Sequence, residues 1–260
     1  MNFIDTHTHV DGPEFDEDRA LVIERAKEAG ASKLLIPAID LKSMDTVLDT
    51  CNKYKGYAYP MVGLHPEEVK ADYKEALAEL HKYLERDNEF IAIGEIGLDY
   101  YWSREFENEQ LDAFETQIKW SVETGLPVSI HCRKAQNEMI KILKKYKNDL
   151  PGGVFHCFTG NEIEAAELLD FDKFVLGIGG VITFKKSHLP EVIKTIPLER
   201  IVLETDAPYM APAPMRGTRN ESSYIPYIIE KISLALGITM DEVARQTTEN
   251  AERVFFSKTN

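Results

Sequence analysis

Two histidines separated by one residue follow the first apolar run of the chain. The run covers residues 3–5, and His7 and His9 come shortly after it. In an extended strand alternate side chains point to the same face, so the two imidazoles are expected to lie together. Two imidazoles held in this way form half of a site for a divalent metal ion. The same pattern also arises by chance, so the interpretation needs further ligands.

Further imidazoles and carboxylates stand at the ends of other short apolar runs. They are Glu95, His131, His156 and Asp206. If these runs are the strands of one barrel, the side chains converge with the first two histidines on the rim where barrel enzymes place their chemistry. Any one of them could be a buried polar residue with an ordinary hydrogen-bond partner. Six together are hard to explain in that way, because an unpaired buried charge is strongly destabilising.

This set of ligands predicts a site for two divalent cations. Imidazole with carboxylate suits Zn, Mn, Fe and Co, whereas Mg prefers an oxygen-rich shell, so the set does not select one metal. A carboxylate between two groups of histidines can bridge two cations about 3.5 to 4 Å apart, the separation used in two-metal hydrolysis. Glu95 is the natural bridge. Asp206 could be a ligand and also accept a proton from the attacking water as the general base.

The elements that must position these residues follow a regular alternation. Eight apolar or β-branched runs are separated by segments of helical periodicity, without a linker rich in Pro, Gly or Ser. The runs begin near Phe3, Lys33, Tyr57, Phe90, Pro127, Gly153, Lys173 and Arg200. This alternation is typical of a parallel sheet surrounded by helices. For a chain of 260 residues it predicts one (β/α)₈ TIM barrel that forms a single domain over residues 1–260.

Helical periodicity predicts six helices in particular. They cover residues 16–29, 72–86, 105–123, 135–146, 222–236 and 240–256. The first ends at Gly30, a residue suited to a left-handed helix cap.

Composition restricts the class of protein. The chain has 30 Lys and Arg against 44 Asp and Glu, a formal charge of −14, which is the wrong sign for a protein that coats nucleic acid non-specifically. Bound cations and a local basic rim can still admit a polyanionic substrate. The apolar runs are far shorter than the roughly 20 residues that span a bilayer, and no signal peptide or CxxC pair is present. We therefore expect a cytoplasmic protein without membrane association, and no protein partner is evident.

Six stretches of the chain resemble the TatD family of the amidohydrolase superfamily. They are residues 3–9 (FIDTHTH), 62–66 (VGLHP), 93–101 (IGEIGLDYY), 127–133 (PVSIHCR), 156–160 (HCFTG) and 203–209 (LETDAPY), in the family's order. The resemblance implies a barrel with two metals, one held by His7, His9, Glu95 and Asp206 and the other by Glu95, His131 and His156. It also implies nuclease activity supported by Mg or Mn, often 3′ to 5′ exonuclease action on DNA.

Other residues near these motifs have more than one possible role. His65 and Glu204 match polar positions beside the family's metal centre and could orient water, support a third cation or contact phosphate. Glu204 could equally hydrogen-bond to a ligand, and Asp5 could orient one of the first two histidines. Arg133 could clamp a phosphate of DNA or RNA. The aromatic residues 100–102 could stack on a base or simply pack at the base of a loop.

Two enzymatic functions are consistent with such a site. The leading hypothesis is phosphodiester hydrolysis by a TatD-like deoxyribonuclease, in which paired cations activate a shared water and stabilise charge on the phosphoryl oxygens. The alternative is an amidohydrolase that cleaves an amide or ester of a small molecule with the same cations, which could be Mg, Mn or Zn. Basic groups around the mouth would favour phosphate, and a neutral or apolar mouth would favour the amide. A non-catalytic metal-binding protein is disfavoured because all six ligand positions are filled.

Overall fold

A computed structural model of the chain describes residues 1–85 and 90–257, and its centre is one sheet of eight parallel strands. Each strand pairs with the next along the chain. The strands are β1 (Phe3–Asp5), β2 (Ala31–Pro37), β3 (Ala58–Val62), β4 (Ala92–Asp99), β5 (Val128–Arg133), β6 (Gly153–Phe155), β7 (Phe174–Ile178) and β8 (Ile201–Leu203). Every strand begins within two residues of its predicted position.

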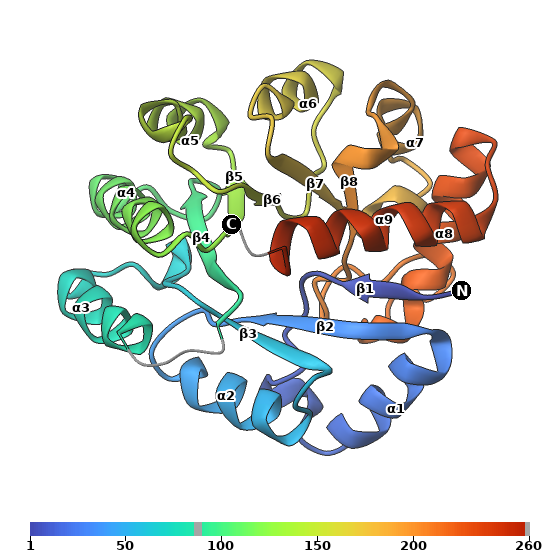
Figure 1. Cartoon of the computed structure of the whole chain (residues 1–260), viewed down its shortest axis with the longest axis horizontal. Helices are drawn as coiled ribbons and strands as arrows, with labels where there is room; N and C mark the ends of the chain where they lie inside the picture. Colours follow the sequence, from blue (N-terminus) through green and yellow to red (C-terminus); the bar gives the residue numbers. More distant parts are fainter. Residues whose placement is uncertain (86–89, 258–260) are drawn as a thin grey trace.

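The sheet closes on itself where the chain continues beyond β1 and β8. The backbone N–H of Asp206 donates to the carbonyl of His7 over 2.9 Å, and that of His9 donates to the carbonyl of Ala207 over 2.8 Å. Thr8 and Ala207 form a parallel bridge between the two segments. These bonds join the first and last strands, which confirms the predicted (β/α)₈ barrel (Figure 1).

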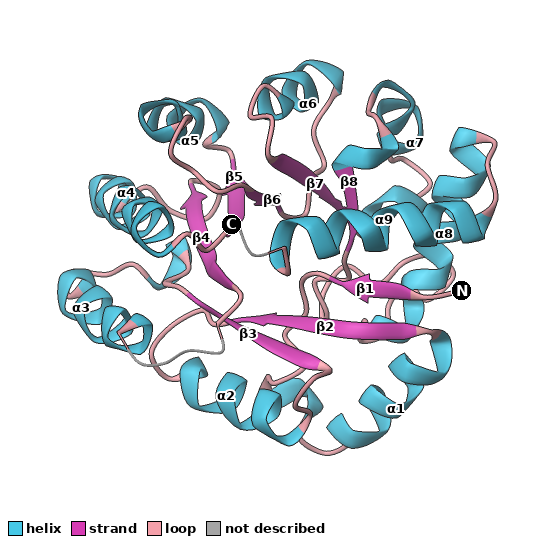
Figure 2. Cartoon of the chain, viewed as in Figure 1, coloured by secondary structure: helices cyan, strands magenta, loops and turns pink. Residues whose placement is uncertain are grey.

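Helices follow the strands and lie around the outside of the sheet (Figure 2). They are α1 (Arg19–Ala29), α2 (Ser43–Lys53), α3 (Tyr73–Leu84), α4 (Glu107–Thr124), α5 (Gln136–Leu143), α6 (Glu162–Leu169), α7 (Leu189–Val192), α8 (Ile225–Leu236) and α9 (Met240–Phe255). Each of the six predicted helices matches one of these, with short 3₁₀ turns at Lys144–Tyr146 and Ser222–Tyr224. Arg86, the last residue of the predicted helix 72–86, lies outside the described residues.

The end of α1 shows why its boundary was predictable. Gly30 has a φ of 106°, in the left-handed region, and its N–H donates to carbonyls of the last helical turn. A Cβ atom at this position would lie 2.5 Å from the carbonyl oxygen of Met1. Only glycine therefore fits both the backbone conformation and the space.

No helix within residues 1–85 and 90–257 is long and apolar enough to cross a membrane.

The barrel interior is filled by apolar side chains and closed at one end by α9. Inward-facing residues of the strands form a cluster with two residues of α9: Ile4, Leu35, Met61, Ala92, Val154, Val175 and Val202, with Ala251 and Phe255. The side-chain amide of Asn250 fixes the helix there by donating to the carbonyls of Leu198 and Ile201, just before and at the start of β8. Because α9 covers the amino-terminal end of the barrel, the carboxyl ends of the strands are left to form a site.

Candidate metal centre

The six predicted ligands lie together at the carboxyl ends of five strands. His7 and His9 follow β1, Glu95 and His131 lie in β4 and β5, His156 follows β6 and Asp206 follows β8. Among the described residues, three overlapping groups have ligand atoms within 4.8 Å of one another. The groups are His7 with His156 and Asp206, His7 with His9 and Glu95, and His65 with Glu95 and His131.

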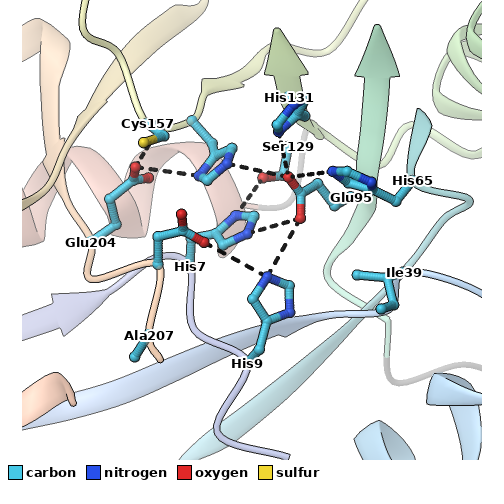
Figure 3. Close-up of polar contacts among 12 residues, drawn as sticks. His7, His9, Ile39, His65, Glu95, Ser129, His131, Cys157, Glu204 and Ala207 are labelled. Carbon is cyan, nitrogen blue, oxygen red and sulfur yellow. Dashed lines mark hydrogen bonds and ion pairs between the residues drawn. The ribbon is translucent and has the colours of Figure 1, made fainter. Parts of the chain in front are cut away.

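Glu95 is the centre of this cluster. Its Oε2 is 3.1 Å from Nε2 of His7 and 3.5 Å from Nε2 of His9. Its Oε1 is 3.1 Å from Nδ1 of His131 and 3.2 Å from Nε2 of His156. The contacts converge on this one carboxylate from two sides (Figure 3). Each carboxylate oxygen therefore faces a different set of imidazoles.

Two further side chains complete the cluster. Oδ1 of Asp206 is 3.8 Å from Nε2 of His9. Nε2 of His65 is 3.4 Å from Oε1 of Glu95, while its Nδ1 accepts a hydrogen bond from the N–H of Glu67. His65 is thus a member of the cluster itself, whereas the sequence placed it only beside the metal centre.

Three of the imidazoles turn their second nitrogen toward a buried polar side chain. Nδ1 of His7 is 3.3 Å from Oγ of Ser129, Nε2 of His131 is 2.9 Å from Oδ2 of Asp99, and Nδ1 of His156 is 3.3 Å from Oε1 of Glu204. All three partner side chains are buried. The hydrogen bonds of His7 and His131 are of the kind that fixes the ring orientation and tautomer of a histidine whose other nitrogen binds a metal. Nδ1 of His156 is within ion-pair distance of Glu204 but forms no hydrogen bond among the described residues.

Sequence reasoning missed Asp99 and Ser129, although strand alternation contained a signal for both. Asp99 lies four residues after Glu95 in β4, and Ser129 lies two residues before His131 in β5. Residues an even number of positions apart share a strand face. Counting along each strand from its predicted ligand would therefore have found them.

Glu204 directly follows β8 and contacts the cluster. Its Oε1 accepts a hydrogen bond from the N–H of Cys157 as well as facing His156, while Oε2 has no hydrogen-bond partner among the described residues. A Cβ on Gly177 would lie 2.1 Å from Oε2, so glycine in β7 leaves the space that this carboxylate occupies. Of the roles expected for Glu204, contact with a candidate ligand is the one that the geometry provides.

Asp5 connects the first and last strands beneath the cluster. Its carboxylate accepts hydrogen bonds from the hydroxyls of Thr205 and Ser222 over 2.7 and 2.6 Å, and from the N–H groups of Thr205 and His7. It therefore holds the backbone from which His7 and Asp206 project. Burial raises its pKa to about 7, although these hydrogen bonds act in the opposite direction.

Burial and close contact shift the protonation of the central groups. Burial opposes ionisation of Glu95, but the surrounding imidazoles outweigh it and hold the pKa of this carboxylate well below its ordinary range. Burial and the neighbouring His156 lower the pKa of His7 to about 3, which keeps its imidazole in the neutral form that binds metals. Burial also disfavours a charge on His131, yet the hydrogen bonds that its ring donates to the carboxylates of Asp99 and Glu95 raise its pKa to about 9.

A cavity of about 1030 Å³ opens above the cluster. Besides the candidate ligands, its charged lining residues are the acidic Asp11, Glu14, Asp40, Glu67 and Glu68 and the basic Lys42 and Arg133. The charged residues of the lining are therefore mainly acidic rather than basic, and this charge alone does not choose between phosphate and amide substrates.

Comparison with known proteins gives concordant matches over nearly the whole chain. A family model described as TatD related DNase matches residues 4–256. The chain is 38% identical over 252 residues to the uncharacterized metal-dependent hydrolase YabD of Bacillus subtilis, covering 96% of this chain and 98% of that protein. It is 35% identical over 257 residues to the 3′-5′ ssDNA/RNA exonuclease TatD of Erwinia tasmaniensis, with the same coverage. The crystal structure of YJJV, a TatD homolog from Escherichia coli, matches with a TM-score of 0.91, 30% identity and 98% of each chain covered. The chain therefore belongs to the family of TatD related DNases.

Proposed function

We propose that this protein is a hydrolase that holds two divalent cations and cleaves phosphodiester bonds of single-stranded DNA or RNA from the 3′ end. The observation that carries the proposal is the position of Glu95, whose two oxygens face separate sets of imidazoles. Membership of the TatD family and the exonuclease name of the Erwinia relative support the choice of substrate.

The residues present fit a pair of cations. The donor atoms are imidazole nitrogens and carboxylate oxygens, which suit Mn or Zn, and Mg where water supplies further oxygens. We assign His7, His9, Glu95 and Asp206 to one cation and Glu95, His131 and His156 to the other, with His65 beside the second set. The buried Oε2 of Glu204, which lacks a hydrogen-bond partner among the described residues, is a further sign of a site built for cations.

The protein's own residues then have separate roles. Bound cations would lower the pKa of a shared water and stabilise charge on the phosphoryl oxygens. Asp206 would accept the proton of that water at a carboxylate oxygen, since it lies in the cluster and lines the cavity. Arg133, also in the lining, would bind non-bridging phosphate oxygens through its planar guanidinium. Asp99, Ser129 and Glu204 would keep the histidine rings in position.

The test is to present the Mn-loaded protein with 5′-labelled single-stranded DNA and RNA and, separately, with dipeptides and acyl amino acids. We expect the labelled strands to shorten stepwise from the 3′ end, because the label at the 5′ end reports the direction of cleavage. A preparation of Asp206→Asn, purified in parallel, controls for contaminating nucleases. Turnover of the amides or esters with intact strands would replace the proposal by the amidohydrolase alternative.

A further inference from the structure

Two aromatic side chains are exposed in the loop between β4 and α4. Tyr101 is 50% exposed and Trp102 is 68% exposed, whereas the adjacent Tyr100 is buried at 7%. Packing at the loop base, one of the roles expected from the sequence, therefore applies to Tyr100 alone. Exposed aromatic side chains beside a cavity indicate a binding surface rather than a core.

Arg133, the last residue of β5, stacks on this aromatic pair. The centre of its guanidinium is 3.6 Å from the ring centre of Tyr101 and 5.3 Å from that of Trp102. The rings of Tyr101 and Trp102 meet edge to face, with centres 4.8 Å apart. The guanidinium donates no hydrogen bond to any residue in the described part of the chain. Its N–H groups are therefore available to a ligand.

A buried carboxylate fixes this surface relative to the metal centre. Oδ1 of Asp99 accepts a hydrogen bond from the N–H of Tyr101 over 2.8 Å, while Oδ2 contacts Nε2 of His131 over 2.9 Å. Trp102 and Arg133 line the same cavity as His131. The exposed rings and the candidate metal ligands thus belong to one continuous site.

The chemistry of the surface matches a nucleotide of a single strand. An exposed indole offers a face on which a base can stack, and the adjacent guanidinium offers donors and positive charge to a phosphate. A base in a duplex has both faces covered by its neighbours, so only an unpaired base can use the indole. The acidic residues of the lining, such as Asp11, Asp40 and Glu68, would repel phosphates placed among them.

We propose that Tyr101, Trp102 and Arg133 form a nucleotide platform on which an unpaired base stacks against Trp102 while Arg133 binds a neighbouring phosphate. The proposal rests on the proposed nuclease function and specifies its substrate as single-stranded nucleic acid that carries a base at this position. Stacking of one base is worth about 1 to 3 kcal/mol, which corresponds to roughly 5- to 150-fold in affinity.

The chain supplies its own reporter for binding. It contains two tryptophans, and Trp120 is buried at 5% in α4, so Trp120→Phe leaves Trp102 as the sole indole. This variant is titrated in Mn²⁺ with a six-residue thymidylate strand whose phosphorothioate linkages resist cleavage, and with an abasic strand of equal length. We expect the thymidylate strand to change the emission of Trp102 and shield it from acrylamide, and to bind at least fivefold more tightly than the abasic strand.

A second measurement uses end-labelled strands, whose anisotropy reports binding without any tryptophan. Trp102→Ala should lose the preference for the base-containing strand, and Trp102→Phe should keep most of it. Leu234→Ala, a change at a side chain in α8 that is 73% exposed and outside the cavity lining, is the matched control and should retain the full preference.

The outcomes separate the platform from the nuclease activity. Equal affinity of the unmodified protein for the two strands, binding of neither strand, or a preference that survives in Trp102→Ala would overturn the platform even if strands are cleaved. A preference for the base that depends on Trp102 would uphold the platform, and failure to cleave any strand would then count against the nuclease activity alone.

Discussion

Replacing Glu95 by glutamine keeps the size of the side chain and removes its charge. In the unmodified protein, Oε2 of the carboxylate faces two imidazoles and Oε1 faces three, at 3.1 to 3.5 Å. An amide has one oxygen and one NH₂ group, so it can serve only one side. The cation on the NH₂ side loses an oxygen ligand, and the cation on the other side keeps a neutral and weaker one.

The loss of a group that only orients a metal ligand sets the scale of the effect. Such a loss typically costs about 10- to 100-fold in metal affinity. Removing the charge of a ligand itself should cost at least as much on the side that keeps an oxygen. The side that loses its oxygen should weaken further. We therefore expect Glu95→Gln to reduce Mn²⁺ affinity at both positions.

Metal content after equilibration in graded Mn²⁺ buffers, together with calorimetric titration, measures both affinities. Glu68→Gln is the matched control, because Glu68 lines the same cavity but is exposed and outside the cluster. Thermal melts of the two variants show whether the fold is retained. Unchanged stoichiometry and affinity in Glu95→Gln, or weakening of one cation with the other spared, would refute the bridge.

Three further changes test other parts of the structure. Asp206→Asn should lower kcat by about 10² to 10⁴-fold while Mn²⁺ stays bound, because a proton acceptor is lost; near-normal kcat in the loaded variant would exclude Asp206 as the base. Asp99→Asn should weaken Mn²⁺ binding by about 10- to 100-fold, because His131 loses a charged partner. The calorimetric Mn²⁺ titration described for Glu95→Gln measures this affinity, and an unaltered affinity would contradict the role of Asp99 in orienting His131. Glu221→Gln should lower the free energy of unfolding by about 1 to 2 kcal/mol at pH 7, because the buried Glu221 accepts two hydrogen bonds from Arg25 at 2.9 and 2.6 Å. Burial opposes ionisation of Glu221, but Arg25 keeps its pKa below the ordinary value, so the contribution is present above about pH 4.3 and is lost as the pH falls below it. Urea unfolding measures the free energy of unfolding of the variant and the wild type at pH 7 and pH 3.5. We expect the difference between the two proteins to be smaller at pH 3.5. An equal difference at both pH values would be inconsistent with this ion pair.

The barrel and the convergence of the six ligands could be predicted because both follow from topology. Strands buried on both faces appear in the sequence as short apolar runs, and the carboxyl ends of all parallel strands meet on one rim. His7 and Asp206 are far apart in the sequence, yet closure between β1 and β8 places the N–H of Asp206 2.9 Å from the carbonyl of His7. No knowledge of side-chain packing was needed for this step.

The face of β4 on which Glu95 and its neighbour Asp99 lie depends on an irregularity in the strand, which the sequence does not reveal. The pairing of β4 with β5 shifts between Ile93 and Ile96. Ala92 belongs to the apolar interior of the barrel and Glu95 to the cluster above it, although they are three residues apart. Alternation counted from the start of the strand therefore places Glu95 and Asp99 on the wrong face, and only counting from Glu95 itself finds Asp99.

The net charge of −14 limits how the protein can attract a nucleic acid strand, because few basic side chains lie at the cavity. Only two of the basic side chains, Lys42 and Arg133, are among the described residues that line the cavity, so release of counterions can contribute little to binding a strand. On the proposed function, attraction for phosphate would then come mainly from cations held by the Glu95 cluster, and attraction for the bases from the exposed rings beside Arg133. The net negative charge of the chain disfavours non-specific binding of strands, so we expect their binding to depend on the metal-loaded site.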